Sequence, residues 1–380
     1  MNEFLKIILC FLCLSSIGIA NSLHANNLRF HSLTTADGLP SISVFQTYQQ
    51  RNGFIWFATD RGASRYDGKS YRHFFYSPGT SNHITNNFVI QIFEDNLGNI
   101  WILTEDGLNK IRLDGGIEYF QHDDSKPDSI NSNWLHFIYQ DSSNRIWIGT
   151  NEGLNLYHAP TNTFIQMVGR SKNTANTIAA FHMVEIGTDN FLLGTLQGIS
   201  FFKPSEQAFT LESDKDNDVP RWYQDDISSM TLSKTGRVLI GTQTEGLIDF
   251  NPASYEFTQY KVALDEDSIA SNAVETIIER PNGDILLGHY EKGLMLISSN
   301  RQTFSLLTAR QFDETSLISN TINHLFEDQS GLLWISTDYG ISTLSYLQSG
   351  SNLIQRQANG MGLSGMIVFD TALMDKEHML

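Results

Sequence analysis

A short phrase that recurs seven times constrains the fold of this chain more than any other feature. Its clearest copy is "NRIWIGTNEGLNLY" at 144–157, where a tryptophan stands in an apolar run before a polar turn and a glycine. Four copies carry this tryptophan, three carry leucine instead, and all follow one another at nearly even intervals. Even repetition with a period of roughly 20–50 residues is typical of solenoids and propellers. The seven positions are Trp56, Trp101, Trp147, Leu192, Leu239, Leu286 and Trp334.

Each unit has the pattern of four short strands joined by tight turns. In the third unit the strands are "WLHFIYQD", "RIWIGT", "LNLYHA" and "TFIQMV", and the first two turns are "SSN" and "NEG". Gly153, in the second turn, can take the positive φ that such turns require. No stretch shows sustained helical periodicity, which argues against a helical solenoid. The sequence therefore predicts an all-β chain, a seven-bladed β-propeller of four-stranded blades.

We interpret the repeated tryptophan and glycine as parts of the frame. One face of each blade must pack on the next blade, and a large flat side chain on the second strand fills that layer. The exchange of tryptophan for leucine in units four to six fits packing, because a packing site tolerates an apolar exchange that chemistry would not. Positions at which the units differ are therefore the better candidates for function.

The two ends of the chain predict how the ring closes. Residues 28–33 resemble the outer strand of a unit, whereas the seventh unit lacks a good outer strand of its own. We expect this N-terminal strand to complete the seventh blade and to leave no sheet edge open. From Asn352 the sequence resembles its own beginning, which predicts a fragment that enters a second propeller. The expected domains are a signal peptide at 1–25, the propeller at 26–350 and the first strands of a second, truncated propeller at 351–380.

The N-terminal segment is predicted to be a secretory signal peptide. Lys6 precedes an apolar run that is too short for a comfortable membrane span, and Gly18-Ile19-Ala20 offers a cleavage site. An uncleaved anchor is the alternative. Both cysteines, Cys10 and Cys13, lie in this segment, so we expect a mature protein without disulfides or thiolate metal sites. The segment predicts a periplasmic protein.

The repeats resemble the two-component regulator propeller family. The pattern is a linker "D-x-x-S-[IL]-x-[SN]-N", an apolar strand, and then "D-x-x-G-x-[IL]-W-[IF]-x-T-x-x-G-[LI]". The linker occurs at 265–272 and 313–320, and the strand motif at 327–341. The resemblance extends over nearly all of 28–380 and weakens in units four to six, which lack the tryptophan.

This resemblance implies a role in signalling. Family members are periplasmic sensor halves of membrane receptors, with two propellers, an immunoglobulin-like domain, one membrane helix and a cytoplasmic histidine kinase or diguanylate cyclase. It implies that this chain is a non-catalytic ligand-binding sensor domain, attached to a membrane only through downstream parts. An oligosaccharide or another small molecule is the implied ligand, and a homodimer of the full-length receptor is a further implied partner. The formal net charge of −17 argues against nucleic acid, which needs basic surfaces.

A ligand site is predicted where the linkers and the turns between second and third strands open on one face of the ring. One column of the inner strands stays apolar, but the next column varies and is often polar, so it is expected to line the central channel. Aromatic side chains beside hydrogen-bonding groups suit sugar rings. The alternative is that Trp134 and Trp222 are buried linker packing. The candidate ligand-binding residues are Arg61, Trp134, His136, Arg221, Trp222, Tyr223, Glu275 and Asn323.

Other chemistry finds little support in the sequence. Asp214, Asp216 and Asp218 alternate as in a calcium loop, but Val219 stands where the loop needs glycine, so this metal candidate is weak. No zinc spacing, nucleophile elbow or phosphate loop occurs, and we expect no catalytic residues and no cofactor. The alternatives to a sensor are a propeller glycoside hydrolase or lyase, in which Glu275 would need a partner carboxylate, and a protein-binding scaffold.

Overall fold

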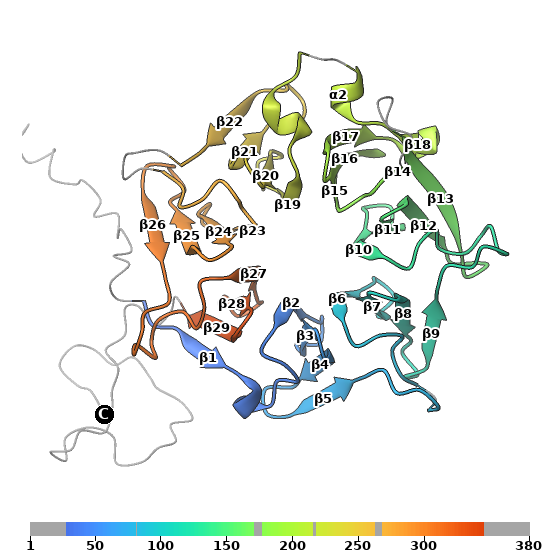
Figure 1. Ribbon diagram of the computed structural model, residues 1–380, viewed down its shortest axis with the longest axis horizontal. Helices are drawn as coiled ribbons and strands as arrows, with labels where there is room; N and C mark the ends of the chain where they lie inside the picture. The colour runs from blue at the N-terminus through green and yellow to red at the C-terminus, as the bar shows by residue number, and fades with distance from the viewer. Residues whose placement is uncertain (1–27, 81, 171–176, 216–217, 263–267, 346–380) are drawn as a thin grey trace, which may run out of the picture. The chain divides into compact units, whose positions relative to one another are not determined.

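Seven sheets surround a central axis as the blades of a β-propeller, which confirms the predicted fold (Figure 1). The predicted signal peptide and the predicted start of a second propeller lie outside the described residues. Within the described part, no helix is long and apolar enough to span a bilayer. The computed structural model describes residues 28–80, 82–170, 177–215, 218–262 and 268–345.

Blades 1 to 3 follow the predicted strand order, from the inner to the outer edge of the ring. The turn residue Gly153 has a φ of 111°. A Cβ there would lie 2.5 Å from the Met167 carbonyl oxygen, so the turn excludes larger residues. Blade 1 consists of β2 (Val44–Gln49), β3 (Ile55–Thr59), β4 (Gly62–Tyr66) and β5 (Tyr71–Phe74); blade 2 of β6 (Val89–Glu94), β7 (Ile100–Thr104), β8 (Gly107–Ile111) and β9 (Ile117–Phe120); blade 3 of β10 (Leu135–Gln140), β11 (Ile146–Thr150), β12 (Gly153–His158) and β13 (Thr163–Arg170), extended by β14 (Thr177–Ile178).

Blades 4 to 7 repeat this order, with short helical turns in the linker between blades 4 and 5. Blade 4 consists of β15 (His182–Gly187), β16 (Asn190–Thr195) and β17 (Gly198–Phe202); blade 5 of β19 (Ile227–Leu232), β20 (Val238–Thr242), β21 (Leu247–Phe250) and β22 (Phe257–Tyr260); blade 6 of β23 (Thr276–Glu279), β24 (Ile285–His289), β25 (Gly293–Ile297) and β26 (Phe304–Leu307); blade 7 of β27 (Ile322–Glu327), β28 (Leu332–Thr337), β29 (Gly340–Ser345) and β1 (His31–Leu33). The remaining elements are η2 (Thr35–Asp37), η3 (Pro204–Glu206), β18 (Ala208–Phe209), α2 (Glu212–Lys215) and η4 (Arg221–Gln224).

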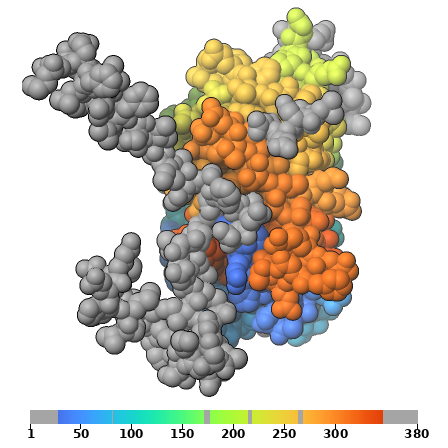
Figure 2. Space-filling view, turned by 90° about the vertical axis from the view of Figure 1, so that its left-hand side faces the viewer, coloured from blue at the N-terminus to red at the C-terminus, as the bar shows by residue number. Residues whose placement is uncertain are grey.

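The N-terminal strand closes the ring as predicted. β1 pairs antiparallel with β29, in the register His31 to Thr343 and Leu33 to Ile341. Phe30 is buried beside this strand, and its backbone N–H donates to the Thr315 carbonyl at 2.8 Å. Figure 2 shows the blue N-terminal residues against the orange and red residues of the last blades.

Blade 4 differs from the prediction of four strands, because its expected outer strand pairs elsewhere. β18 runs parallel to β13 of blade 3, with Gly169 opposite Phe209. The Phe209 ring is 2% exposed and lies against Gly169, where a Cβ would approach the ring to 2.6 Å. Burial of this ring in the layer between blades 3 and 4, beside Trp147 and Phe202, fixes the strand to the neighbouring blade.

The core is divided into apolar layers between neighbouring blades, and the repeated tryptophans lie in these layers. Trp56 packs against Val89 and Ile92 of the next blade, and Trp147 packs against Met183 and Phe191. The leucines that replace tryptophan are also buried, at 0–1% exposure. The structure therefore confirms that this column is packing.

All four repeated tryptophans also donate a hydrogen bond, which the sequence interpretation did not include: Trp56 donates to the Gln50 amide oxygen at 3.2 Å, and those of blades 2, 3 and 7 donate to an aspartate. The Trp101 indole Nε1 donates to the Asp95 carboxylate at 2.9 Å. The same carboxylate accepts from the backbone N–H groups of Leu97 and Asn99, so it also shapes the turn before the strand. Equivalent indole bonds join Trp147 to Asp141 and Trp334 to Asp328, each at 2.8 Å.

Side chains at the end of the inner strands clamp neighbouring blades together at the face away from the predicted ligand site. Each accepts the backbone N–H of a turn in the preceding blade at 2.8–3.0 Å; these bonds are Glu94 to Arg51, Gln140 to Asn96, Glu185 to Ser142, Glu279 to Lys234 and Gln49 to Gln329. In blade 6 the turn has Pro281 at this position, which has no N–H to donate. Glu327 of blade 7 therefore binds the Arg280 guanidinium instead, at 3.0 Å. Blade 5 carries Leu232 at this position, and its apolar side chain has no acceptor for a clamp to blade 4.

Candidate functional site

The variable column of the inner strands lies on β-bulges at the end of the ring where the predicted site opens. Five of its residues interrupt the pairing between the first and second strands of their blades. Phe181 and Glu275 hold the equivalent place in blades 4 and 6. Their backbone N–H groups donate to the carbonyl oxygens of Gly194 and Gly288, each at 2.9 Å. A bulge re-aims a side chain away from the regular pleat. The full column is Phe45, Ile90, His136, Phe181, Ser228, Glu275 and Asn323.

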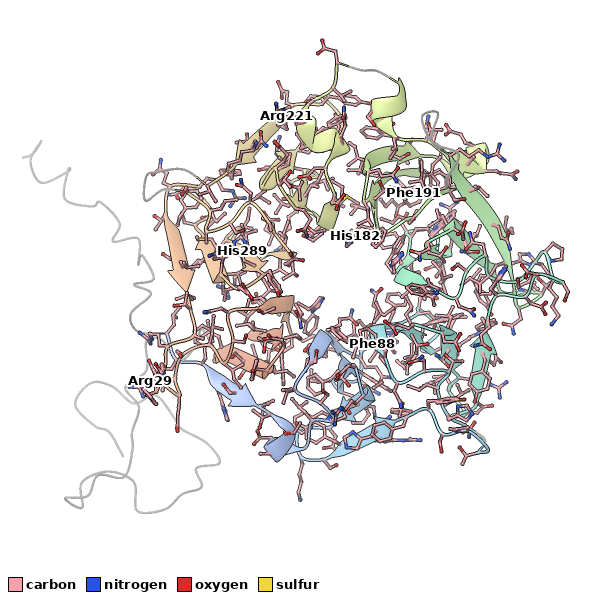
Figure 3. The ribbon with its side chains drawn as sticks, viewed as in Figure 1. Arg29, Phe88, His182, Phe191, Arg221 and His289 are labelled. Atoms are coloured by element: carbon pink, nitrogen blue, oxygen red, sulfur yellow. The ribbon has the colours of Figure 1, made fainter. Side chains whose placement is uncertain are left out.

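His136 belongs to an aromatic corner of this column. Its ring stacks on Phe181 at a centroid distance of 3.7 Å, and its Nε2 donates to Asn151 Oδ1 at 2.6 Å. Burial lowers the pKa of His136, and the bond to Asn151 opposes this change. Burial and the neighbouring His136 lower the pKa of His182 to about 4. These two imidazoles are therefore neutral at pH 7, and Figure 3 places His182 beside the central opening.

Glu275 and Asn323 are brought together in one cavity of about 340 Å³ at the mouth of the channel. Glu275 Oε1 accepts from Gln243 Nε2 at 3.2 Å, and the Asn323 amide donates to the Val44 carbonyl at 2.9 Å. The cavity spans blades 6, 7, 1 and 2, and its other walls are Phe45, Phe88, Ile90, Tyr290, Thr321 and Ile322.

Trp134 lines a different cavity, of about 590 Å³, beside the linker between blades 2 and 3. Its side chain is 64% exposed, so here the alternative of buried linker packing is wrong. His136 follows Trp134 by two residues but is not among the lining residues of this groove. The other walls of the Trp134 groove are His122, Asn131, Ser132, Asn133, Glu152, Gln166, Val168 and Thr177.

The structure corrects the placement of Trp222 and Tyr223, which are buried and not on a ligand surface. η4 turns both rings inward, where Trp222 packs edge-on against Phe250 at a centroid distance of 5.3 Å. Trp222 shares this layer with Leu192, so it adds bulk to a layer in which blade 4 has leucine for tryptophan. For Trp222 the packing alternative therefore holds.

The two predicted arginines, Arg61 and Arg221, are exposed, but neither lines the channel-mouth cavity or the Trp134 groove. Arg221 lies on the outer side of the ring, away from the central opening (Figure 3). Arg61 is exposed on the turn between β3 and β4 and lines neither the channel-mouth cavity nor the Trp134 groove.

Sequence reasoning missed three residues that line the channel-mouth cavity, and the buried His289 of blade 6. Phe45 and Phe88 form a ring pair at 4.6 Å, and Tyr290 stands 59% exposed on the same cavity. The even spacing of the units could have found Phe45, which lies one unit before Ile90. In the six other blades a threonine hydroxyl donates to the carbonyl oxygen of the turn glycine, as Thr59 does to Gly62 at 2.7 Å. In blade 6 the buried His289 stands in place of this threonine.

The weak calcium candidate falls only in part within the described residues. Asp216 lies outside them, and the structure does not describe the side chain of Asp214. Among the residues described, no group of three or more His, Cys, Asp or Glu side chains is placed to hold a metal ion. The Asp218 prediction therefore remains a prediction.

Comparison with known families identifies the repeats. Residues 83–106, 129–152 and 316–339 match the family described as two component regulator propeller. Each match runs from the linker through the inner and second strands to the turn that follows, in blades 2, 3 and 7. None of the curated proteins matches the chain.

Solved structures with the same fold include a domain of a two component system, a secretion-system component and a lyase. The extracellular domain of the hybrid two component system BT3049 from B. thetaiotaomicron shares 20% identity at a TM-score of 0.69, over 84% of this chain and 42% of that one. PorZ, a bacterial surface component of the type-IX secretion system of Porphyromonas gingivalis, shares 17% at 0.60, over 81% and 47%. Virginiamycin B lyase from Staphylococcus aureus shares 12% at 0.52, over 83% and 98%. The chain thus spans less than half of the first two structures, and these identities establish the fold alone.

Proposed function

We propose, from the two-component regulator propeller repeats of blades 2, 3 and 7, that this chain is the extracytoplasmic sensor domain of a signal-transduction receptor. Extracellular domains of two hybrid two component systems with this fold support the proposal and a periplasmic location. In such a receptor the propeller binds a ligand, and a histidine kinase or diguanylate cyclase in the full-length protein gives the output.

We further propose that the Trp134 groove binds an oligosaccharide. An exposed indole presents a flat apolar face, which packs on the C–H face of a sugar ring. The side chains of Asn133, Glu152 and Gln166 surround it with amide and carboxylate groups that can bond sugar hydroxyls. A cavity of about 590 Å³ accommodates a few sugar units.

The Trp134→Ala variant tests this proposal. A thermal-shift screen against a panel of oligosaccharides should find a ligand that raises the unfolding temperature, because binding to the folded state stabilises it. The same ligand should bind Trp134→Ala at least about tenfold more weakly in isothermal titration calorimetry, as for loss of an aromatic contact of about 1.5 kcal/mol.

Two comparisons make that result specific. Tyr255, which is 58% exposed on blade 5, supplies the matched control, and Tyr255→Ala should bind as the unchanged protein does. Equal affinity of Trp134→Ala and the unchanged chain would refute the groove as the site. Release of chromophore from a panel of chromogenic glycosides would instead favour the hydrolase or lyase alternative.

A further inference from the structure

The channel-mouth cavity combines an apolar wall with a single carboxylate. Phe45 and Phe88 lie 4.6 Å apart between ring centroids, and Ile90 extends their surface. Among the described residues of the lining, Glu275 is the only acidic one, and it stands on the opposite side, in blade 6. This cavity shares no lining residue with the Trp134 groove, so a variant in one leaves the lining of the other unchanged.

Glu275 has no cationic partner within the described residues. Its carboxylate accepts a 3.2 Å hydrogen bond from the Gln243 amide, which is neutral. The side chain is half-buried in the lining of this cavity, where an unpaired charge is costly. A bound cation would neutralise that charge, whereas a neutral ligand would cover it and raise its cost.

The surrounding face would attract such a cation. The seven turns that open on this face carry more acid than base, and in the described part of the chain only Glu245 of these acids has a lysine partner, Lys261 at 2.5 Å. Carboxylates gathered on one face raise the local concentration of cations and speed their arrival. The acidic residues are Asp60, Glu105, Asp106, Glu152, Glu245, Glu291 and Asp338, against Arg61 and Lys292.

We propose that the channel-mouth cavity binds a small organic cation, with its ammonium group on Glu275 and its apolar body against Phe45 and Phe88. Tyr290, exposed at the rim, adds a third aromatic face that a cation can approach. A bare metal ion fits less well, because the lining offers one carboxylate and metal sites use several such ligands. The cavity volume of about 340 Å³ suits a ligand of one aromatic ring and a short amine chain.

Calorimetric titration with 2-phenylethylammonium chloride tests the proposal, with 2-phenylethanol as the uncharged probe of equal shape. The unchanged protein should bind the amine at least about tenfold more tightly than the alcohol, as for one charge-assisted hydrogen bond. In Glu275→Gln this preference should fall below about threefold, because the charge that favours the amine is gone. Glu291→Gln, on the same blade and face but outside the cavity, should keep it.

A second variant keeps the carboxylate and changes the apolar wall. Phe88→Ala should weaken the binding of both the amine and the alcohol severalfold and leave the ratio of their affinities unchanged. If the Glu275→Gln protein does not fold, Phe88→Ala is the deciding variant. No measurable amine binding, equal binding of amine and alcohol, or an unchanged preference in Glu275→Gln would each overturn the proposal.

Discussion

At the scale of single residues, the aspartate before the tryptophan explains why the two types occur together. Asp95 is 2% exposed and accepts from two backbone N–H groups as well as from the Trp101 indole. Leu239 and Leu286 have no donor, and the residues at the same distance before them are Ser233 and Arg280. In blades 2, 3 and 7 the carboxylate and the indole are therefore parts of one unit, whereas Trp56 of blade 1 donates to the Gln50 amide oxygen.

The Asp95→Ala variant should lower the free energy of unfolding by roughly 2–4 kcal/mol, because it leaves the buried Trp101 indole N–H and two partly buried backbone N–H groups without an acceptor. Urea denaturation measures this change. In a double-mutant cycle with Trp101→Leu, the two losses should fall short of additivity by about 1 kcal/mol or more. Asp124→Ala, at an exposed site of the next linker, should change stability by less than about 0.5 kcal/mol. Strict additivity would refute the pairing.

The sequence predicted the packing tryptophans but could not place every aromatic residue. Trp222 and Trp134 both follow polar linkers, and nothing in those linkers marks one ring as buried and the other as exposed. One is buried and the other exposed, because η4 turns Trp222 into the layer between blades 4 and 5. That outcome depends on the space left by other blades, which local sequence does not encode.

At the scale of strands, the clamps between neighbouring blades suggest a stabilising change. Leu232 is 48% exposed at the junction where the inner strand offers no side-chain acceptor. Leu232→Gln would supply an amide oxygen at the place from which Gln140 reaches Asn96. We expect it to raise the free energy of unfolding by about 0.5–1 kcal/mol.

Chemical denaturation checks that expectation against a matched change elsewhere. Gln140→Leu, which removes the clamp between blades 2 and 3, should lower the free energy of unfolding by about 1 kcal/mol. A less stable Leu232→Gln protein would show that the clamp geometry does not transfer to the junction of blades 4 and 5.

The strand order was predictable because each strand is a local pattern in the sequence. The pairing of β18 was not predictable. Its two residues pair with β13 rather than with blade 4, because this pairing buries Phe209 against Gly169. The candidate site shows the same division. The bulged column was visible as a variable position, but the joining of Glu275 and Asn323 with Phe88 and Tyr290 required the closed ring.

At the scale of the whole molecule, closure by β1 makes one short segment important for the entire ring. A chain that begins at residue 35 would lose the pairing with β29 and the burial of Leu28 and Phe30. Burial of two such side chains is worth roughly 3–6 kcal/mol. We expect a fall in the unfolding temperature of several degrees or more, measured by circular dichroism.

Restoration in trans makes the closure test specific. A synthetic peptide of residues 26–36 should recover the lost stability in a concentration-dependent way, because it binds the folded state. A shuffled peptide should not. An unchanged unfolding temperature in the shortened chain would contradict closure by this strand.

The pairing of β1 with β29 also orders events in time. The strand that completes the ring is made first, and its partner follows about 300 residues later. At a synthesis rate of roughly 5–20 residues per second, β29 is synthesised on the order of 15 to 60 seconds after β1, and until then β1 has no strand to pair with. During that interval Leu28 and Phe30, which are buried in the closed ring, lack the blade that covers them.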